Sequence, residues 1–371
     1  MFKKYLKLFF IILGIFGANL TLAKEIVVKD VLDREVKLNL PAKRIVLGFY
    51  YTDFLAVGGI EAFDKVVGFV KDGWAVYAKN SYEFYAQFIP RIKNLADVGD
   101  PQFGTFSAEK VLSLKPDLLI LAAWQYEIIR EDLAIFEKHN IPVVVIDYNQ
   151  ESVARHSLST EILGQILRQE EKALELVDFY KSRISVIQER IKSAALPKPK
   201  IYIEFGNKGP QENSFTFGDD MWGALIDLAG GENIAKNLVK KWGVINPELV
   251  LAANPDVIII TGRESDLEKN KEAMVMGFNI EENEALKRLE RFKFRKGYEN
   301  LNAIIHHKLF GAYHRASTTL ADVAMVEFIA KTLYPSLFED IDPLKTYLDF
   351  HQKFLLAKPQ GTFMIKAKNA K

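Results

Sequence analysis

Aromatic, polar and cationic side chains follow several apolar runs of this 371-residue chain. They are Tyr50, Tyr51, Trp74, Tyr77, Phe103, Trp124, Gln125 and Tyr126 in the first half, and Asn207, Lys208, Ser214, Phe215, Trp242, Arg263, Tyr313, His314 and Arg315 in the second. Aromatic faces stack on a catecholate or a macrocycle, and cations neutralise an anionic complex, Arg by forked hydrogen bonds. The set predicts a binding site for an anionic metal complex such as an iron chelate. Arg263, which directly follows an expected strand, is the first candidate for the cation, and Lys208 is the next.

Tyr313 and His314 are candidate metal ligands. A neutral imidazole and a phenolate can fill open coordination positions on a partly chelated metal. The alternative is a hydrogen-bonded structural role, which is the commoner one for a single His. His306 and His307 are expected side by side on a strand, where neighbouring side chains point to opposite faces and do not share a metal.

Other chemistries use some of the same residues. A small oxyanion needs hydroxyls, backbone N–H groups and one or two cations, for which Tyr50, Thr52, Ser214, Arg263 and His314 are available. An enzyme would use Asp53, Glu204 and His314, but the sequence contains no nucleophile elbow, phosphate loop, dinucleotide fingerprint or His-Glu-x-x-His motif. We therefore expect a binding protein without a cofactor of its own. A secreted scaffold, the third class, would expose an apolar patch instead of forming a polar and aromatic cleft.

The elements that position these residues are indicated by a passage that occurs twice, at Ser107–Leu121 and Asn246–Ile260. In each copy a capping residue opens a helix, a Glu (Glu109 or Glu248) lies in its first turn, a Pro-Asp pair ends it, and an apolar run follows as a buried strand. The repeat predicts two matched α/β halves with a cleft between them.

Between the halves, residues 152–195 contain no Pro and carry apolar residues at helical spacing. A helix of about 40 residues would extend about 60 Å, and Gly164 is a candidate break in it. Residues 264–300 are densely charged and are interpreted as a solvated helical face.

Composition and the amino terminus indicate an exported protein. The chain has 49% hydrophobic and 26% charged residues with a net charge of +1, which gives no basic excess for nucleic acid. Residues 1–23 have the pattern of a secretory signal, with Lys3, Lys4 and Lys7 before an apolar stretch and small residues up to Ala23. Cleavage there leaves 46 basic and 48 acidic residues. Because the chain has no Cys, we expect neither a disulfide nor a lipid anchor, and a protein free in the bacterial periplasm.

Over about residues 25–340 the chain resembles the periplasmic substrate-binding proteins of ABC importers for iron complexes and cobalamin. The resemblance rests on the Glu-x6-Pro-Asp repeat, on Lys200–Gly206 followed by Ala229–Ile234, and on Trp242 through Thr261. It implies an α/β fold with two Rossmann-like lobes, a ligand cleft between them and a single long α-helix that joins them. The expected parts are a signal peptide (1–23), an N-terminal lobe (24–152), a linker helix (153–196), a C-terminal lobe (197–345) and a tail (346–371).

The resemblance also implies a function and a partner. Such a protein captures a ferric siderophore or related iron chelate as a monomer, with a modest closing of its lobes, and delivers it to an ABC permease in the inner membrane. Glu109 and Glu248 match the two positions that form salt bridges with the permease, although both also favour their own helix dipoles. Relatives with extensions like residues 264–300 and the tail bind molybdate or tungstate, so a small oxyanion or a nickel chelate is the alternative ligand.

Overall fold

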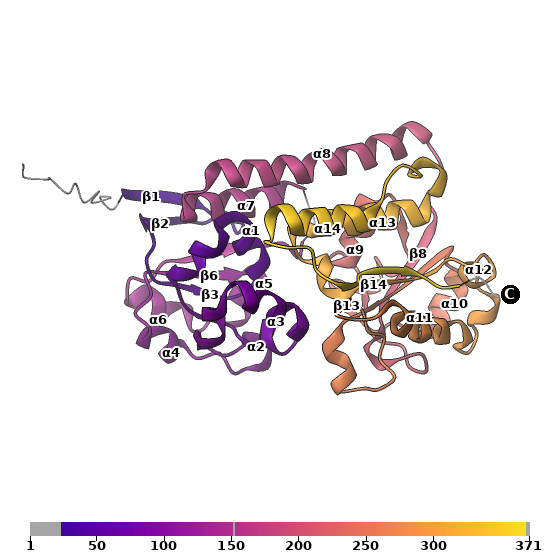
Figure 1. Cartoon of the computed structure of the whole chain (residues 1–371), viewed down its shortest axis with the longest axis horizontal. Coiled ribbons are helices and arrows are strands. Elements are labelled where there is room, and N and C mark those ends of the chain that lie inside the picture. Colours follow the sequence, from indigo (N-terminus) through magenta and orange to yellow (C-terminus); the bar gives the residue numbers. More distant parts are fainter. Residues whose placement is uncertain (1–23, 151–152, 369–371) are drawn as a thin grey trace, which may run out of the picture.

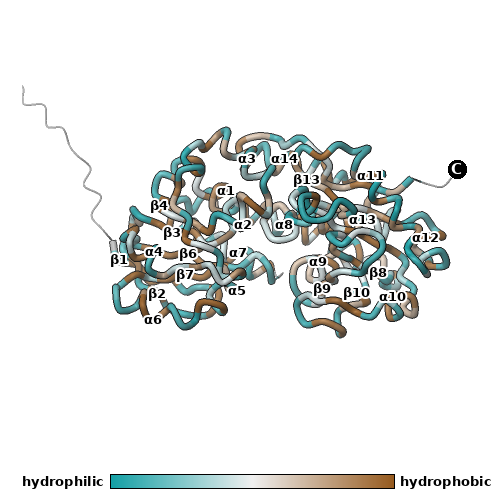
Figure 2. The backbone as a smooth tube through the Cα atoms, turned by 90° about the horizontal axis from the view of Figure 1, so that it is seen from below, coloured by the Kyte–Doolittle hydropathy of each residue, from teal (hydrophilic) through white to brown (hydrophobic). Residues whose placement is uncertain are grey.

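The two expected lobes lie side by side in the computed structural model, which describes residues 24–150 and 153–368. The proposed signal peptide lies outside the described residues. None of the described helices is both long and apolar enough to cross a bilayer. The α/β fold class is confirmed, with two lobes side by side and the long helix α8 running along both of them (Figures 1 and 2).

The N-terminal lobe is built on a parallel five-stranded sheet in the order β5-β4-β3-β6-β7. The strands are β3 (Ile45–Leu47), β4 (Val66–Phe69), β5 (Ala96–Asp97), β6 (Leu118–Ala122) and β7 (Val143–Ile146), and the hairpin β1–β2 (Lys24–Lys29 and Glu35–Leu40) precedes them. The helices are α1 (Tyr51–Ala62), α2 (Asp72–Ala75), α3 (Lys79–Phe88), α4 (Ala108–Ser113), α5 (Ala123–Ile128) and α6 (Leu133–Lys138). Every residue of β6 is buried, as expected for a strand covered on both faces.

The C-terminal lobe has a sheet in the order β11-β9-β8-β12-β14-β16, with β10 also paired to β8. Its strands are β8 (Lys200–Phe205), β9 (Thr216–Phe217), β10 (Glu232–Asn233), β11 (Trp242–Gly243), β12 (Val257–Gly262), β14 (Leu309–Tyr313) and β16 (Met364–Lys366). The helices are α9 (Trp222–Leu228), α10 (Pro247–Ala253), α11 (Glu282–Arg291), α12 (Asn302–Ile305), α13 (Val323–Leu333) and α14 (Pro343–Phe354). The core strands β8, β12 and β14 run parallel.

The repeated passage forms the same unit in both lobes. The Ser107 hydroxyl accepts a hydrogen bond from Lys110 N–H at 3.2 Å at the start of α4, and the Asn246 side chain accepts one from Glu248 N–H at 3.0 Å at the start of α10. The strands β6 and β12 follow the two helices. The predicted cap, helix and buried strand are therefore present in both copies.

The linker consists of two packed helices, α7 (Val153–Leu167) and α8 (Glu170–Ala194). The chain turns at Arg168, whose φ is 56°, and not at Gly164. Gly164 lies inside α7, where a Cβ would be only 2.6 Å from the Ala173 Cβ of α8. Its lack of a side chain thus allows close helix packing, and α8 alone extends along both lobes for about 37 Å (Figure 1).

The carboxyl-terminal part of the chain differs from the expected tail. A boundary at residue 346 would cut α14, and β16 pairs antiparallel with β14 as a strand of the C-terminal sheet. The short strand β15 (Gly361–Thr362) pairs with β13 (Gly277–Phe278). The buried side chains of Phe363 and Ile365 make this segment part of the lobe's core.

The charged segment 264–300 is only partly the expected solvated helix. It contains the short 3-10 helix η5 (Glu264–Glu268) and the helix α11, but Arg295 is 5% exposed. The sequence pattern predicts a strand at residues 303–310. In the structure α12 occupies the first half of that range, and β14 begins only at Leu309. His306 and His307 therefore lie in the turn between α12 and β14.

Candidate ligand-binding cleft

A cleft of about 530 Å³ lies between the two lobes. Six of the ligand-binding residues predicted from the sequence line it, namely Trp124, Phe215, Trp242, Arg263, His314 and Arg315. Tyr77, Phe103 and Asn207, which followed apolar runs in the same way, line it as well. The positions at the carboxyl ends of the strands thus converge on one space, as in open α/β sheets generally.

A continuous column of rings and one guanidinium crosses the cleft from lobe to lobe. In the N-terminal lobe, Tyr77 stacks on Phe103 with ring centroids 5.0 Å apart. The Arg263 guanidinium lies 5.2 Å from the Tyr77 ring and 5.0 Å from the Phe205 ring. Phe205 then stacks on His314 at 4.0 Å in the C-terminal lobe. Both lobes therefore contribute to one aromatic surface.

Three of the cations that line the cleft already have partners. Arg263 donates to both carboxylate oxygens of Asp266 at 2.9 to 3.0 Å, so its charge is largely compensated. Lys241 forms an ion pair with Glu127 of the opposite lobe at 3.4 Å. The ammonium group of Lys269 lies 4.7 Å from the centroid of the Tyr77 ring.

Within residues 24–150 and 153–368, neither Arg315 nor Lys269 forms an ion pair with a carboxylate, but Lys269 is exposed whereas Arg315 is part-buried. Its Nη2 donates one long hydrogen bond, of 3.5 Å, to the Gly73 carbonyl oxygen of the N-terminal lobe. Its guanidinium lies 4.9 Å from the Phe49 ring. Burial lowers the pKa of this side chain, which indicates a cation that is poorly solvated. Arg315 is thus a part-buried cleft cation without a paired carboxylate, and Glu264 acts on it only as a nearby charge.

His314 presents a neutral imidazole to the cleft. Burial, together with the charges of Arg263 and Arg315, holds the pKa of His314 well below its ordinary value. Its Nδ1 lies 3.0 Å from the Thr261 hydroxyl, which itself donates to the Glu204 carbonyl oxygen at 3.4 Å. When the hydroxyl donates to that carbonyl it accepts from Nδ1–H, and in this tautomer Nε2 keeps the lone pair that a metal ligand needs.

Seven other residues predicted from the sequence to bind the ligand do not line the cleft, for identifiable reasons. Tyr50 bonds through its hydroxyl to Asp147 and Asn149, and Gln125 accepts from Ala122 N–H and donates to the Gly48 carbonyl. Tyr51 and Trp74 stack on each other at 4.8 Å within the N-terminal lobe. Tyr126 bonds to Arg34 on the outer side, at 2.8 Å. These aromatic side chains build the lobe and do not contact the cleft.

Lys208 and Tyr313 also lie elsewhere. Lys208 is solvent-facing and pairs with Glu212 at 3.5 Å. Tyr313 is 2% exposed and lines a separate inner cavity of about 50 Å³ behind Arg315. Burial raises the pKa of its phenol well above the ordinary value, which disfavours the phenolate required for metal binding. Of the two predicted metal ligands, only His314 faces the cleft.

The structure adds cleft residues that the sequence reasoning did not select. They are Phe49, Gln102, Glu127, Ile128, Asn149, Phe205, Phe217, Met221, Lys241, Lys269 and Thr318. Phe49 belongs to the run that directly follows β3, so the strand-end rule could have identified it. Most of the others come from loops whose course depends on the lobe interface.

The polar set considered for an enzyme is not assembled. Asp53 is buried, accepts from Leu320 N–H at 2.8 Å, and burial raises its pKa to about 7. Glu204 is fully buried and paired with Arg295. Neither lines the cleft with His314. Within the described part of the chain, no group of three or more His, Asp or Glu side chains could hold a metal ion.

Glu109 and Glu248 lie in the first turns of α4 and α10, one in each lobe (Figure 1). Both are exposed, and neither forms an ion pair with another residue that the structure describes. The two carboxylates are therefore available to a basic partner.

Comparison with known proteins gives a consistent set of matches. Residues 48–315 match the family model described as periplasmic binding protein. The molybdate-binding protein MolA of Haemophilus influenzae is 23% identical over 358 residues, which cover 88% of this chain and 90% of MolA. An uncharacterized ABC transporter substrate-binding lipoprotein of Bacillus subtilis, YvrC, is 25% identical over 254 residues, which cover 67% of this chain and 71% of YvrC. The crystal structure of the TroA-like periplasmic binding protein FepB from Veillonella parvula superposes with a TM-score of 0.84 at 31% identity, over 92% of this chain and all of FepB.

Proposed function

The chain belongs to the periplasmic binding protein family, and we propose that it captures an anionic, aromatic metal chelate of the ferric siderophore type for an ABC permease. The observation that carries this proposal is the cleft itself. It combines an aromatic column with a part-buried arginine that forms no ion pair with a carboxylate among the described residues. In this reading the protein releases its ligand unchanged.

The size of the cleft favours a chelate over a bare oxyanion. Its 530 Å³ lies in the range of pockets that enclose drug-sized ligands, about 300 to 1,000 Å³. A tetrahedral oxyanion takes up only the space of a few water molecules, about 30 Å³ each. It would leave most of the aromatic column in contact with water.

Charge and geometry assign roles to the individual residues. Arg315 neutralises the ligand's negative charge, while Trp124, Phe215 and Trp242 cover its aromatic faces. His314 occupies a free coordination position of the metal through Nε2 where the chelator leaves one open. The metal is cargo held within the chelate.

Delivery to the permease uses Glu109 and Glu248. Exposed carboxylates at the starts of two matched helices present one negative charge on each lobe. Basic residues of a membrane partner recognise such a pair by charge complementarity. We further propose that residues 1–23 direct export and that the mature chain is a soluble monomer in the periplasm. YvrC is named as a lipoprotein, but this sequence contains no Cys to which a lipid could be attached.

Molybdate is the second candidate ligand, and a specific similarity favours it. MolA matches over nearly the whole of both chains, and its name states that it binds molybdate. For this chain, Arg315 and His314 would be the groups that contact the oxyanion. The alternative differs from the first proposal in the aromatic column, which an oxyanion would not use.

Titration with a panel of ligands distinguishes the two candidates. The purified protein is titrated with a ferric tris-catecholate complex, haem, cobalamin, a nickel chelate and molybdate, while tryptophan fluorescence is recorded, since Trp124 and Trp242 line the cleft. We expect saturable one-to-one quenching by the ferric complex and recovery of that complex intact.

The His314→Ala variant reports on the metal in the same titration. If His314 ligates the metal, the absorption spectrum of the bound ferric complex changes in this variant. Saturable binding of molybdate with none of the ferric complex would contradict the chelate proposal, and chemical conversion of the bound complex would contradict a carrier role.

A further inference from the structure

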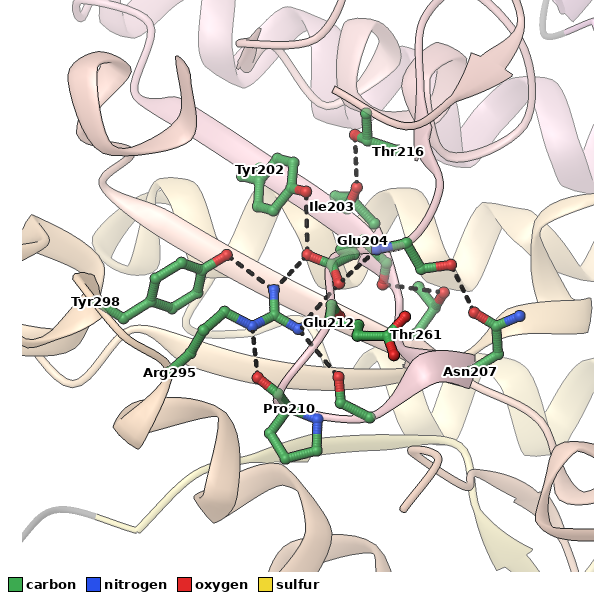
Figure 3. Close-up of polar contacts among 12 residues, drawn as sticks. Tyr202, Ile203, Glu204, Asn207, Pro210, Glu212, Thr216, Thr261, Arg295 and Tyr298 are labelled. Atoms are coloured by element: carbon green, nitrogen blue, oxygen red, sulfur yellow. Dashed lines mark hydrogen bonds and ion pairs between the residues drawn. The ribbon is translucent and has the colours of Figure 1, made fainter. Parts of the chain in front are cut away.

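A buried ion pair lies behind the C-terminal wall of the cleft (Figure 3). Glu204, near the end of β8, is 0% exposed, and Arg295, between α11 and α12, is 5% exposed. The two side chains meet in a fork, with Nη1 to Oε2 at 2.6 Å and Nη2 to Oε1 at 3.0 Å. Arg295 thus joins the charged segment 264–300 to the end of a central strand.

Arg295 also holds the loop that follows β8, while its Nη1 makes one further hydrogen bond, to the Tyr298 hydroxyl at 3.1 Å (Figure 3). Its Nε donates to the Pro210 carbonyl at 2.9 Å, and Nη2 donates to the carbonyls of Gly209 at 3.2 Å and Glu212 at 3.1 Å (Figure 3). Three backbone carbonyls within four residues therefore converge on one guanidinium. Such convergence fixes the course of residues 206–215 and requires the planar, five-donor group of Arg.

Glu204 holds the other end of the same loop. Its Oε1 accepts from Ser214 N–H at 3.2 Å, and the Ser214 hydroxyl donates to the Asn207 side-chain oxygen at 2.6 Å. Asn207 and Phe215 are the loop residues that line the cleft. The ion pair is therefore linked to the ligand site by two hydrogen bonds.

Stability alone gives little reason to bury this pair. Two charges lose their hydration on burial, and apolar residues of similar volume often replace a buried ion pair without loss of stability. The pair and its carbonyl contacts instead define one conformation of an otherwise irregular loop.

We propose that Arg295 is a positioning residue, which together with Glu204 holds residues 206–215 in the conformation that presents Asn207 and Phe215 to the ligand. This inference rests on the proposed function, since it concerns the same cleft. It assigns a role to the segment 264–300 beyond that of a solvated surface.

The Arg295→Lys variant tests the proposal. Lys keeps the charge that Glu204 needs, but a single ammonium group cannot reach three carbonyls in the plane of a fork. We expect backbone amides of residues 206–215 to exchange with deuterium at least about tenfold faster, and the affinity for the ferric tris-catecholate complex to fall by about tenfold. The matched control is Arg183→Lys. Arg183 is a part-buried residue outside the cleft, and its guanidinium pairs with the buried carboxylate of Glu327 at 2.7 Å. This variant should change neither the deuterium exchange of residues 206–215 nor the affinity for the ferric complex.

A second variant guards against misfolding of the first. Ser214→Ala removes only the hydroxyl that orients Asn207 and leaves the ion pair in place, so it should weaken binding by a few-fold in a fully folded protein. The proposal is overturned if a folded Arg295→Lys protein has the same deuterium exchange in residues 206–215 and the same affinity for the ferric complex as the native protein. It is also overturned if the affinity falls while the deuterium exchange of these residues stays unchanged. Failure of the native protein to bind the ferric complex would instead contradict the proposed function, and the exchange measurement would still decide whether Arg295 holds the loop.

Discussion

Residue types at the ends of the strands predict a kind of ligand, but they do not show which side chains face the cleft. Arg263 and Arg315 both follow β-strands of the C-terminal lobe, β12 and β14. Asp266, three residues further along the chain, neutralises Arg263, whereas Arg315 projects toward the opposite lobe and meets a carbonyl there. Two similar residues in the sequence thus have different electrostatic roles.

This difference predicts that Arg315 contributes more to binding than Arg263. The Arg315→Gln variant should weaken binding of the ferric tris-catecholate complex by about 1.5 to 3 kcal/mol, because a charged hydrogen-bond donor is lost. Arg263→Gln should have a smaller effect on affinity. Calorimetric titration of both variants measures the difference.

Lys208→Ala is the control for this comparison, since Lys208 lies outside the cleft and pairs with Glu212. Its affinity should equal that of the native protein. An unchanged affinity in Arg315→Gln would remove Arg315 from the site.

Elements near the carboxyl terminus complete the C-terminal lobe. The segment that contains β15 and β16 adds an edge strand to the sheet and inserts Phe363 beside Phe278, Tyr313 and Tyr347. Tyr313 immediately precedes His314, so this packing supports the backbone from which the cleft residues project. The segment therefore supports the cleft wall without lining the cleft itself.

The Phe363→Ala variant tests this role of the segment. Phe363 is 1% exposed, and truncation of such a ring in a core costs about 3 to 5 kcal/mol of unfolding free energy. Urea denaturation measures the loss. Gln360→Ala, an exposed position three residues earlier, should change the unfolding free energy by less than about 0.5 kcal/mol. A loss below about 1 kcal/mol in Phe363→Ala would indicate that the segment packs only loosely.

The whole molecule is held together by more than the helix α8. The lobes also touch through Asn80, which donates to the Phe278 carbonyl at 2.7 Å, and through Tyr85 and His351, whose polar atoms lie 3.0 Å apart. On another side of the cleft, Met221 N–H donates to the Asn149 carbonyl at 2.9 Å. Contacts at several places around the cleft are consistent with only a modest closing of the lobes.

Glu109 and Glu248, one exposed carboxylate on each lobe, are the proposed docking pair. If Glu109 and Glu248 bind the permease, the double variant Glu109→Ala/Glu248→Ala should abolish uptake of the ligand in cells while its affinity for the purified protein stays unchanged. Uptake of the radiolabelled ferric complex and a parallel titration measure the two quantities.

Glu61→Ala/Glu339→Ala is the control, because it removes one exposed carboxylate from each end of the molecule at other positions. It should transport normally. Normal uptake by the Glu109→Ala/Glu248→Ala protein would exclude the docking role.

The sequence by itself determined the features that depend on local patterns. Capping residues, first-turn Glu residues and apolar runs predicted α4–β6 and α10–β12 as matched units, because such patterns act over a few neighbouring residues. The same reasoning correctly placed Trp124, Phe215, Trp242, Arg263, His314 and Arg315 around a common space.

Only the tertiary structure decided which aromatic and charged residues face that space. Tyr50 and Tyr51 follow β3, and Tyr313 is the last residue of β14, but their partners are far away in the sequence, such as Asp147 for Tyr50 and Phe363 for Tyr313. Likewise, Arg295 looks like part of a solvated charged run until Glu204, 91 residues earlier, is placed beside it. Burial and charge compensation depend on contacts between distant segments, and a local pattern contains no information about those contacts.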